Sequence, residues 1–277
     1  MTGRRPTSRA ASGDGAGSRT AGRSESGDAA ARLAASFGFE EVAPPEKSGR
    51  VRAVFDSVAG RYDLMNDIMS MGVHRLWKEA MLDWLAPRAG RRYLDLAGGT
   101  GDVAERLLDR VGGRAAVVLA DINVSMLEVG RDRALDRGWP GAVRFLAADA
   151  QQLPFADAQF DACTMAFGIR NVTHVDRALA EIRRVLAPGG RFLCLEFSRL
   201  VLPGLERLYD AYSLSVLPVM GRIVAGDASS YRYLAESIRR FPDQDTFAGM
   251  IRRAGFEQVR HRNLSGGIAA IHSGWRL

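Results

Sequence analysis

A glycine-rich turn that directly follows a short apolar run is the part of this sequence best suited to chemistry. Residues 93–102 read Tyr-Leu-Asp-Leu-Ala-Gly-Gly-Thr-Gly-Asp, and an amphipathic stretch follows over residues 103–111. A strand, turn and helix of this kind bring backbone N–H groups and a helix N-terminus close to a bound ligand, because glycines let the ligand approach the main chain. Within the turn we expect ligand contacts from Asp95, Gly99, Thr100 and Gly101.

Two classes of ligand fit this turn. Residues 99–104 match the loose dinucleotide pattern G-x-G-x-x-G/A. Asp95, however, stands just before the turn, where a carboxylate accepts a hydrogen bond from a cationic amine and repels a pyrophosphate. S-adenosylmethionine carries an ammonium and a sulfonium but no phosphate, so Asp95 favours this methyl donor over a dinucleotide. A purely structural turn is the third alternative.

Two further acidic positions stand at the ends of later strand-like runs. Asp121 follows the glycine turn by about 20 residues, where a carboxylate can accept both ribose hydroxyls. Enzymes that bind NAD use the same position, so Asp121 does not discriminate between the two ligands. Asp149 and Ala150 follow the next run, where an acid can bind the adenine amino group and a small side chain leaves room for the ring. Asp149 could equally cap a turn or a helix.

The elements that must position these residues alternate between strand and helix patterns, which predicts an α/β fold. We expect seven strands, at residues 93–96, 115–121, 143–148, 160–166, 191–197, 256–263 and 268–275. The last two follow each other without a helix, so they should form an antiparallel hairpin at the sheet edge. Five βα units before such a hairpin are typical of class I methyltransferases, a Rossmann-like, mostly parallel sheet with helices on both faces. A classical dinucleotide fold continues instead with parallel strands.

The first 36 residues differ in composition from the rest of the 277-residue chain. They are rich in Arg, Ser, Gly, Ala and Thr, and Leu33 is their one large aliphatic residue besides Met1. Such a segment cannot bury enough apolar surface to offset its ordering entropy, so we expect residues 1–36 to be disordered and residues 37–277 to form one domain. An organelle transit peptide is the alternative, although the acidic residues and the lack of an apolar face argue against it.

Charge and composition exclude several classes of protein. Of the net charge of +6, half lies in the first 36 residues, which hold six Arg and three acids, and no basic stripe is interleaved with aromatics. We therefore expect no nucleic-acid partner. No apolar run approaches the roughly 20 residues that span a bilayer. Cys163 and Cys194 fall in apolar runs and are expected to be buried thiols. No Cys/His cluster has metal-ligand spacing, so no metal is expected.

Three long motifs make a resemblance specific. Residues 54–67 (Val-Phe-Asp-Ser-Val-Ala-Gly-Arg-Tyr-Asp-Leu-Met-Asn-Asp), continued by Ser70, His74 and Trp77, resemble the N-terminal signature of the ubiquinone/menaquinone biosynthesis C-methyltransferases. Residues 167–173 (Phe-Gly-Ile-Arg-Asn-Val-Thr), together with residues 184–190 and 195–198, resemble a second signature of this family. A third runs from Tyr231 through Tyr233-Leu234 and Ser237-Ile238 to Phe241-Pro242 and Gln244. The resemblance covers residues 37–277.

The resemblance implies methyl transfer from S-adenosylmethionine to a ring carbon of a polyprenylated benzoquinol or naphthoquinol. By residue-for-residue match, Thr100, Asp121, Asp149 and Ala150 would contact the donor. The family often has Ser where this chain has Ala166, so a side-chain hydroxyl contact to the donor is missing and backbone contact alone remains.

The chemistry requires exact placement of two reactants and a way to favour a phenolate, since loss of the phenolic proton makes the ring carbon more nucleophilic. Arg170 can stabilise the developing oxyanion, and Asn171 can orient a substrate oxygen or a proton-accepting water. Tyr62, from the N-terminal segment expected to cover the site, can complete this network. The structural alternatives are a salt bridge for Arg170, a helix cap for Asn171 and surface packing for Tyr62.

Residues 200–224 form an apolar insertion, expected either to pack as a helix on the sheet or to cover an isoprenoid tail. Because such a substrate resides in the membrane, we expect a cytoplasmic protein with peripheral association at the inner membrane. Other quinone-biosynthesis enzymes and a second copy of this chain are the protein partners considered. His74 and Trp77 are expected to anchor a helix rather than bind a ligand.

Three other functions are alternatives to quinol C-methylation. One is a methyltransferase that acts on a soluble small-molecule oxygen or nitrogen. Another is a non-enzymatic scaffold with the same fold, against which the retained carboxylates and Arg170-Asn171 argue. The third, an NAD-dependent reductase, is excluded if the final hairpin is antiparallel.

Overall fold

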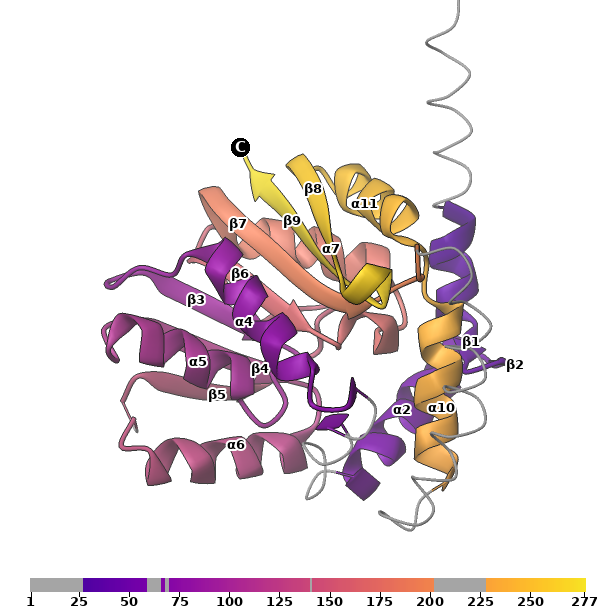
Figure 1. Cartoon of the computed structure of the whole chain (residues 1–277), viewed down its shortest axis with the longest axis horizontal. Helices are drawn as coiled ribbons and strands as arrows, with labels where there is room; N and C mark the ends of the chain where they lie inside the picture. Colours follow the sequence, from indigo (N-terminus) through magenta and orange to yellow (C-terminus); the bar gives the residue numbers. More distant parts are fainter. Residues whose placement is uncertain (1–26, 59–65, 68–69, 140, 202–227) are drawn as a thin grey trace, which may run out of the picture.

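The computed structural model describes residues 27–58, 66–67, 70–139, 141–201 and 228–277, which surround one central sheet (Figure 1). The strands of this sheet are β3 (Arg92–Leu96), β4 (Ala116–Asp121), β5 (Val143–Ala147), β6 (Phe160–Ala166), β7 (Leu186–Phe197), β8 (Glu257–Leu264) and β9 (Ala269–Arg276). Their spatial order is β5-β4-β3-β6-β7-β9-β8. The first five strands pair in parallel, whereas β9 is antiparallel to both β7 and β8. The expected α/β fold with a terminal antiparallel hairpin is confirmed.

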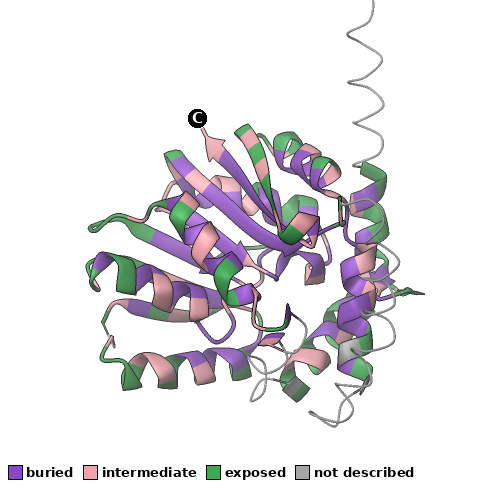
Figure 2. Ribbon diagram, viewed as in Figure 1, coloured by how far each residue is buried: buried purple, intermediate pink, exposed green. Residues whose placement is uncertain are grey.

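Side chains of each strand alternate between two helical layers. In β3, Tyr93 joins a buried cluster with α4 (His74–Leu85) and α5 (Asp102–Val111), whereas Leu94 and Leu96 join a second cluster with α7 (Val175–Val185) and α11 (Gln244–Arg253). This alternation follows from the two-residue period of a strand. Figure 2 shows buried residues along the central strands and exposed ones on the outer helix faces. Each fully buried Leu contributes roughly 1.5–3 kcal/mol.

The two cysteines lie where the sequence predicted them. Cys163 and Cys194 lie buried in β6 and β7 as free thiols. Among the described helices, none combines the length and the apolar character that crossing a membrane requires.

Part of the N-terminal segment is ordered where the sequence predicted disorder. Residues 27–34, which lie inside the segment expected to be disordered, form a helix, and Ala29 and Leu33 are only 4% and 3% exposed. Both pack into the cluster of α7 and α11. Residues 27–34 are ordered despite their composition, because a segment with few apolar residues can still pack against a core that other elements supply. Residues 1–26 lie outside the described part of the chain.

The same N-terminal segment continues along one end of the sheet. A two-stranded ribbon, β1 (Ser36–Phe37) and β2 (Glu40–Glu41), leads into helix α2 (Pro44–Val58). Figure 1 shows α2 beside α10 (Ala228–Arg240), and the hydroxyls of Ser57 and Ser230 are 3.3 Å apart. These elements are not part of the central sheet, yet they reach the carboxyl ends of its strands.

Candidate active site

A cleft of about 820 Å³, a volume that includes its open mouth, lies at the carboxyl ends of the parallel strands. Its lining comes from the turns after β3, β4, β5 and β6, from the short 3-10 helix η2 (Ile169–Asn171) and from α2. The apolar part is formed by Val51, Phe55, Leu96, Met126, Phe167 and Val172, and two carboxylates, Asp121 and Asp149, lie among them. Open α/β sheets bind ligands at this edge, and the combination suits a nucleoside and an apolar ring.

Asp121 ends β4 and lines the cleft. Its Oδ2 accepts the Gly99 N–H at 2.9 Å, and its Oδ1 accepts the Asn123 N–H at 2.9 Å. Burial raises the pKa of this carboxyl, and hydrogen bonds from the backbone oppose the rise. A carboxylate has about four lone-pair positions, so Asp121 retains acceptors for the hydroxyls of a ribose.

Asp149 and Ala150 line the cleft just beyond β5. Asp149 Oδ1 accepts the backbone N–H of Gln151 at 2.9 Å and the side-chain amide of the same residue at 3.0 Å. The turn-capping alternative is therefore present in the structure. It holds the carboxylate at the cleft, so the cap and a ligand contact are compatible.

Fewer residues of the glycine turn line the cleft than the sequence predicted. Gly99 lines the cleft, whereas Thr100 and Gly101 line a separate pocket between α5 and α6 (Val124–Asp136). Thr100 Oγ1 accepts a hydrogen bond from Arg133 at 3.2 Å. Gly101 has φ +87° and stands at the N-cap of α5, a conformation that favours glycine. The structure thus does not bring the Thr100 hydroxyl into the main cleft.

The floor of the cleft is a close approach of two turns. Ala97, after β3, has φ +51°, and Gly168, after β6, lies so near that an added Cβ would be 2.5 Å from the Ala97 Cβ. Glycine at position 168 is therefore what permits a side chain at position 97. Ala166, at the end of β6, lies outside the lining of the main cleft and faces a smaller cavity next to it.

Asp95 also faces that smaller cavity rather than the cleft. It is 1% exposed, its Oδ1 accepts the Thr164 hydroxyl at 2.8 Å, and its Oδ2 accepts the Ala104 N–H at 3.2 Å. Burial raises the pKa of Asp95 to about 7. The carboxylate thus joins β3, β6 and the first turn of α5, and Ala97 lines both the smaller cavity and the cleft.

Arg170 forms the buried ion pair that was the structural alternative to a catalytic role. Its Nη1 donates to Glu196 Oε1 at 2.7 Å and to the Phe167 carbonyl at 2.6 Å. The two side chains are 3% and 1% exposed, and Arg170 does not line the main cleft. Burial raises the pKa of Glu196, while Arg170 opposes the rise. The Nε of Arg170 is buried and has no hydrogen-bond partner among the described residues.

Asn171 lines the cleft beside this ion pair. Its Oδ1 accepts the hydroxyl of Tyr233 at 2.9 Å, and its Nδ2 donates to the Phe167 carbonyl at 3.4 Å. The Tyr233 ring stacks on Phe37 at 4.2 Å between centroids. Burial raises the pKa of Tyr233, so the phenol remains protonated and donates to Asn171. The helix cap proposed as the alternative for Asn171 is not what the structure shows.

Helix α2 is tied to the same side of the cleft. Lys47 is 1% exposed, and its Nζ donates to the carbonyls of Leu33 at 2.6 Å and Val172 at 3.2 Å. Burial lowers the pKa of Lys47 to about 8. The hydroxyls of Ser48 and Thr173 are 2.9 Å apart. Asp56, near the end of α2, accepts the amide of Asn123 at 2.8 Å.

Three residues near the cleft were not predicted from the sequence to have a functional role: Tyr233, Glu196 and Lys47. Tyr233 and Glu196 do lie inside the recognised motifs, so a signal existed for both. Lys47 precedes Val51 and Phe55 by four and eight residues. That spacing places a charged residue on the apolar face of the helix, which is a weak signal for a buried lysine.

Two expected participants lie outside the described residues. Tyr62 falls in the undescribed segment 59–65, and of the apolar insertion 200–224 the structure describes only residues 200 and 201. Among the described residues, no group of three or more His, Cys, Asp or Glu side chains could hold a metal ion.

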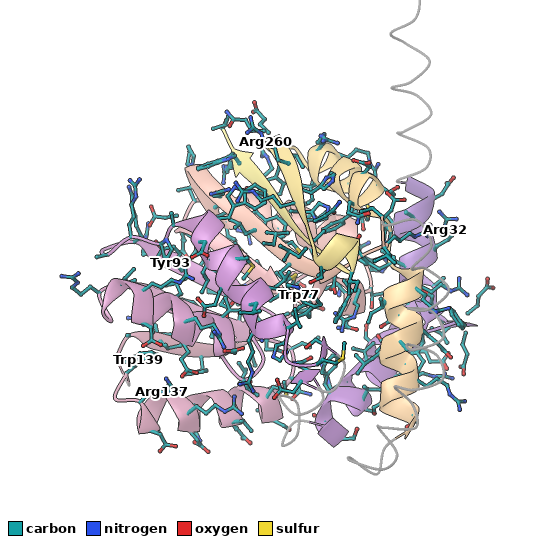
Figure 3. All side chains as sticks on the ribbon, in the orientation of Figure 1. Arg32, Trp77, Tyr93, Arg137, Trp139 and Arg260 are labelled. Atoms are coloured by element: carbon teal, nitrogen blue, oxygen red, sulfur yellow. The ribbon has the colours of Figure 1, made fainter. Side chains whose placement is uncertain are left out.

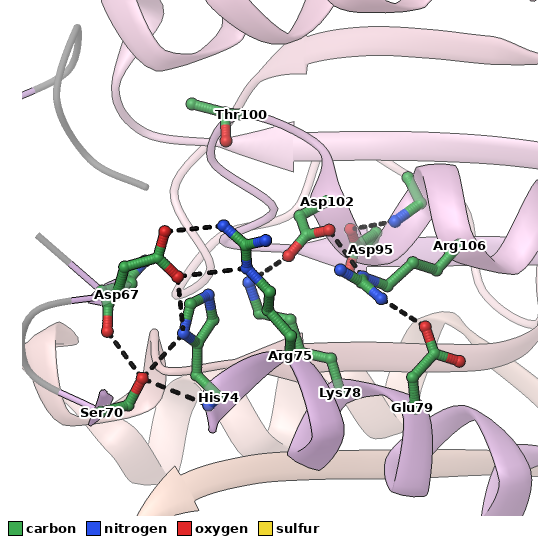
Figure 4. A network of polar contacts seen from close by, with 12 residues as sticks. Asp67, Ser70, His74, Arg75, Lys78, Glu79, Asp95, Thr100, Asp102 and Arg106 are labelled. Carbon is green, nitrogen blue, oxygen red and sulfur yellow. Dashed lines mark hydrogen bonds and ion pairs between the residues drawn. The ribbon is translucent and has the colours of Figure 1, made fainter. Parts of the chain in front are cut away.

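Helix α4 is anchored by polar contacts, as expected for His74 and Trp77. His74 Nδ1 lies 2.8 Å from the Ser70 hydroxyl, and burial lowers its pKa to about 4. Trp77, near the centre of the molecule in Figure 3, donates from Nε1 to Ser265 at 2.9 Å. Figure 4 shows Lys78 and Arg106 reaching the Asp102 carboxylate from two sides. The Lys78 Nζ lies 2.6 Å from Asp102 Oδ2.

Comparison with known proteins adds independent findings. Residues 44–276 match the model of the ubiE/COQ5 methyltransferase family. A protein of Brucella anthropi named ubiquinone/menaquinone biosynthesis C-methyltransferase UbiE is 57% identical over 244 residues, which cover 87% of this chain and 93% of the relative. A protein of the same name from Ruegeria sp. is 57% identical over 241 residues, 87% of this chain and 96% of the relative.

Solved structures match the fold. A SAM-dependent methyltransferase of Thermotoga maritima superposes with a TM-score of 0.58 at 20% identity, covering 81% of this chain and 99% of that one. A SAM-dependent methyltransferase of Aquifex aeolicus gives a TM-score of 0.54 at 17% identity, covering 72% of this chain and 89% of that one. These likenesses confirm the class I methyltransferase fold.

Proposed function

The chain belongs to the ubiE/COQ5 methyltransferase family, and on this premise we propose that it methylates a ring carbon of a polyprenylated quinol in ubiquinone/menaquinone biosynthesis, with S-adenosylmethionine as methyl donor. The acceptor is 2-methoxy-6-polyprenyl-1,4-benzoquinol, demethylmenaquinol or both. The observation that carries the proposal is one cleft lined both by Asp121 and Asp149, from the turns after β4 and β5, and by Asn171, which follows β6 on the other side of β3, together with apolar side chains.

The turns after β4 and β5 have the side chains needed to bind the nucleoside of the donor. Asp121 keeps free lone pairs for the ribose hydroxyls although it binds two backbone N–H groups. Asp149 is an acceptor for the adenine amino group, and Ala150 has a side chain small enough to leave room for the ring. The backbone at Gly99 lines the same part of the cleft. These four residues are the donor contacts that we propose within the main cleft.

The donor supplies an electrophilic methyl group on a sulfonium, and the protein must place a quinol carbon in line with it. The ring carbon forms the new C–C bond, the C–S bond breaks, and the ring carbon then loses its proton to restore aromaticity. We propose that Asn171 orients a quinol oxygen or the water that takes this proton. Tyr233 holds the Asn171 amide in place through its hydroxyl, and the Phe167 carbonyl accepts from the same amide.

The contacts of Arg170 within the protein leave little of its guanidinium for direct contact with the quinol. Its Nη1 is engaged by Glu196 and by the Phe167 carbonyl, which also accepts from Asn171. We propose that Arg170 is a positioning residue that holds this carbonyl and, through it, Asn171. Its buried Nε–H has no partner among the described residues and remains for a water. Tyr62 stays a proposed contributor to the same network.

The isoprenoid tail of the acceptor supports a peripheral association with membranes, because such a substrate partitions into the bilayer. Other enzymes of quinone biosynthesis and a second copy of the chain remain proposed partners.

The function is tested by incubating the purified chain with isotopically labelled donor and each reduced quinol. We expect mass spectrometry to find the label on a ring carbon of at least one quinol, and fragmentation to distinguish C-methyl from O-methyl products. A label found only on oxygen, or only on a soluble phenol or amine, would instead favour a methyltransferase of small soluble molecules.

A further inference from the structure

The smaller cavity beside the cleft has a charge pattern that the reaction described above does not use. Its volume is about 310 Å³, its open mouth included, and Ala97 lines both this cavity and the main cleft, so the two spaces are neighbours. Its polar lining consists of Lys78, Asp95, Thr100 and Asp102. Lys78 comes from α4, outside the glycine turn, and Figure 4 shows its ammonium at the Asp102 carboxylate.

Lys78 is a buried cation with unused donors. Its side chain is 6% exposed, and its Nζ donates to Asp102 Oδ2 at 2.6 Å. An ammonium has three N–H donors, and Asp102 is the one hydrogen-bond partner of Nζ within the described part of the chain. Asp102 does not depend on Lys78 alone, because Arg106 Nε donates to its Oδ1 at 2.7 Å. Against the upward effect of burial, the two cations lower the pKa of Asp102 to about 2.

The amino-acid end of the proposed donor complements this arrangement. It carries an ammonium and a carboxylate on the same carbon, whereas the cavity presents two carboxylates, Asp95 and Asp102, and one cation, Lys78. With the nucleoside beside Asp121 and Asp149, the amino-acid end of the donor would lie toward Ala97, which lines both spaces. A zwitterion placed with its ammonium toward Asp95 has its carboxylate toward Lys78, which Asp102 then shares, while Arg106 remains as a second cation for Asp102.

We propose that Lys78 binds the α-carboxylate of the methyl donor and makes the enzyme specific for donors that retain it. This inference rests on the proposed function, and it assigns a binding role to a residue of α4, beyond the glycine turn. The alternative is a purely structural salt bridge that ties α4 to the first turn of α5.

The test compares two ligands by calorimetry on the full chain. One is S-adenosylhomocysteine, and the other is S-adenosyl-3-thiopropylamine, which differs by loss of the carboxylate alone. In the wild type, removal of the carboxylate should weaken binding about 10- to 100-fold, the range for a charge-assisted hydrogen bond. In Lys78→Met the ratio of the two dissociation constants should fall close to one, because the variant no longer distinguishes the ligands.

Arg106→Met is the matched control, since Arg106 binds the same Asp102 carboxylate but lines neither space. It should keep the wild-type ratio. Lys78→Gln provides a polar second variant should Lys78→Met fail to fold, and it should also bring the ratio close to one. A wild-type ratio in folded Lys78→Met or Lys78→Gln overturns the proposal and leaves Lys78 structural. If the wild type binds neither ligand, the proposed function itself fails.

Discussion

The two sides of the cleft differ in the sequence separation of the contacts that stabilise each of them. On the side proposed to bind the donor, called the donor wall and formed by the turns after β3, β4 and β5, Asp121 binds Gly99 across 22 residues, and Asp149 binds Gln151 across two. On the acceptor wall, formed by residues 167–173 with the side chains that hold them, the Asn171–Tyr233 bond spans 62 residues. The bond from Lys47 to Val172 spans 125.

The two walls also differ in how deeply their charged groups are buried. The carboxylates of the donor wall line the cleft, whereas the charged groups of the acceptor wall, Arg170, Glu196 and Lys47, are at most 4% exposed. A charge in the interior must remain paired or hydrogen-bonded, because its desolvation is otherwise uncompensated. We therefore expect substitutions in the acceptor wall to change stability together with turnover, and those in the donor wall to change ligand affinity.

The strongest test of this difference is Arg170→Ala. It leaves the Glu196 carboxylate buried without its cation, so the free energy of unfolding should fall by about 3–5 kcal/mol. Turnover should fall as Asn171 loses its support. Urea denaturation and steady-state kinetics measure the two effects. The double variant Arg170→Met/Glu196→Leu should recover much of the stability but not the turnover. Wild-type stability of Arg170→Ala with a selective loss of turnover would instead favour direct contact with the quinol oxygen.

Lys47 makes the stability of the acceptor wall depend on pH. Burial lowers its pKa from 10.5 to about 8, so between these values the unfolded chain holds a proton that the folded chain has lost. The stability of the wild type should therefore rise relative to Lys47→Met as the pH increases from 8 toward 10.5, by up to about 3 kcal/mol. Denaturation of both proteins at pH 7 and pH 9.5 measures the change. A difference that is independent of pH would show that the ammonium keeps its proton in the folded state.

In the donor wall, Asp121→Asn should weaken donor binding while the fold persists. The amide can still accept one backbone N–H, but it loses the charge that strengthens hydrogen bonds to ribose hydroxyls, so the dissociation constant of S-adenosylhomocysteine should rise about 10- to 100-fold. Calorimetry gives the affinity, and turnover at saturating donor should stay near wild type. Unchanged affinity would remove Asp121 from the donor site.

The smallest effect is expected for Tyr233→Phe, which removes one hydrogen bond to Asn171. Stability should fall by about 1 kcal/mol, and turnover should fall with donor affinity unchanged. Tyr93→Phe is the matched control, because the Tyr93 hydroxyl also bonds within the protein, to Arg88, but does not line the cleft. Equal turnover in both variants would show that the Tyr233 hydroxyl is not required to orient Asn171.

The strands show how far sequence patterns reach. The start of β4 and the end of β5 were each predicted within one residue, because alternating apolar residues mark a strand buried on both faces. Strand β7 begins five residues earlier than predicted, at Leu186, because Pro188-Gly189-Gly190 resembles a turn. In the structure, Leu186 pairs with Phe160, and the register shifts before Arg191. A bulge of this kind depends on the partner strand, which sequence patterns do not include.

By itself, the sequence determined the parallel sheet with its terminal hairpin, the glycine turn, and the placement of Asp121 and Asp149 at the strand ends. Each of these follows from local preferences and from the rule that parallel strands end at one edge. Only the tertiary structure decided that Arg170 pairs with Glu196, that Asp95 lies in the smaller cavity, and that Lys47 and Tyr233 support the acceptor wall. The physical reason is desolvation: which groups lose their water, and which partners replace it, is set by the packing of segments distant in sequence.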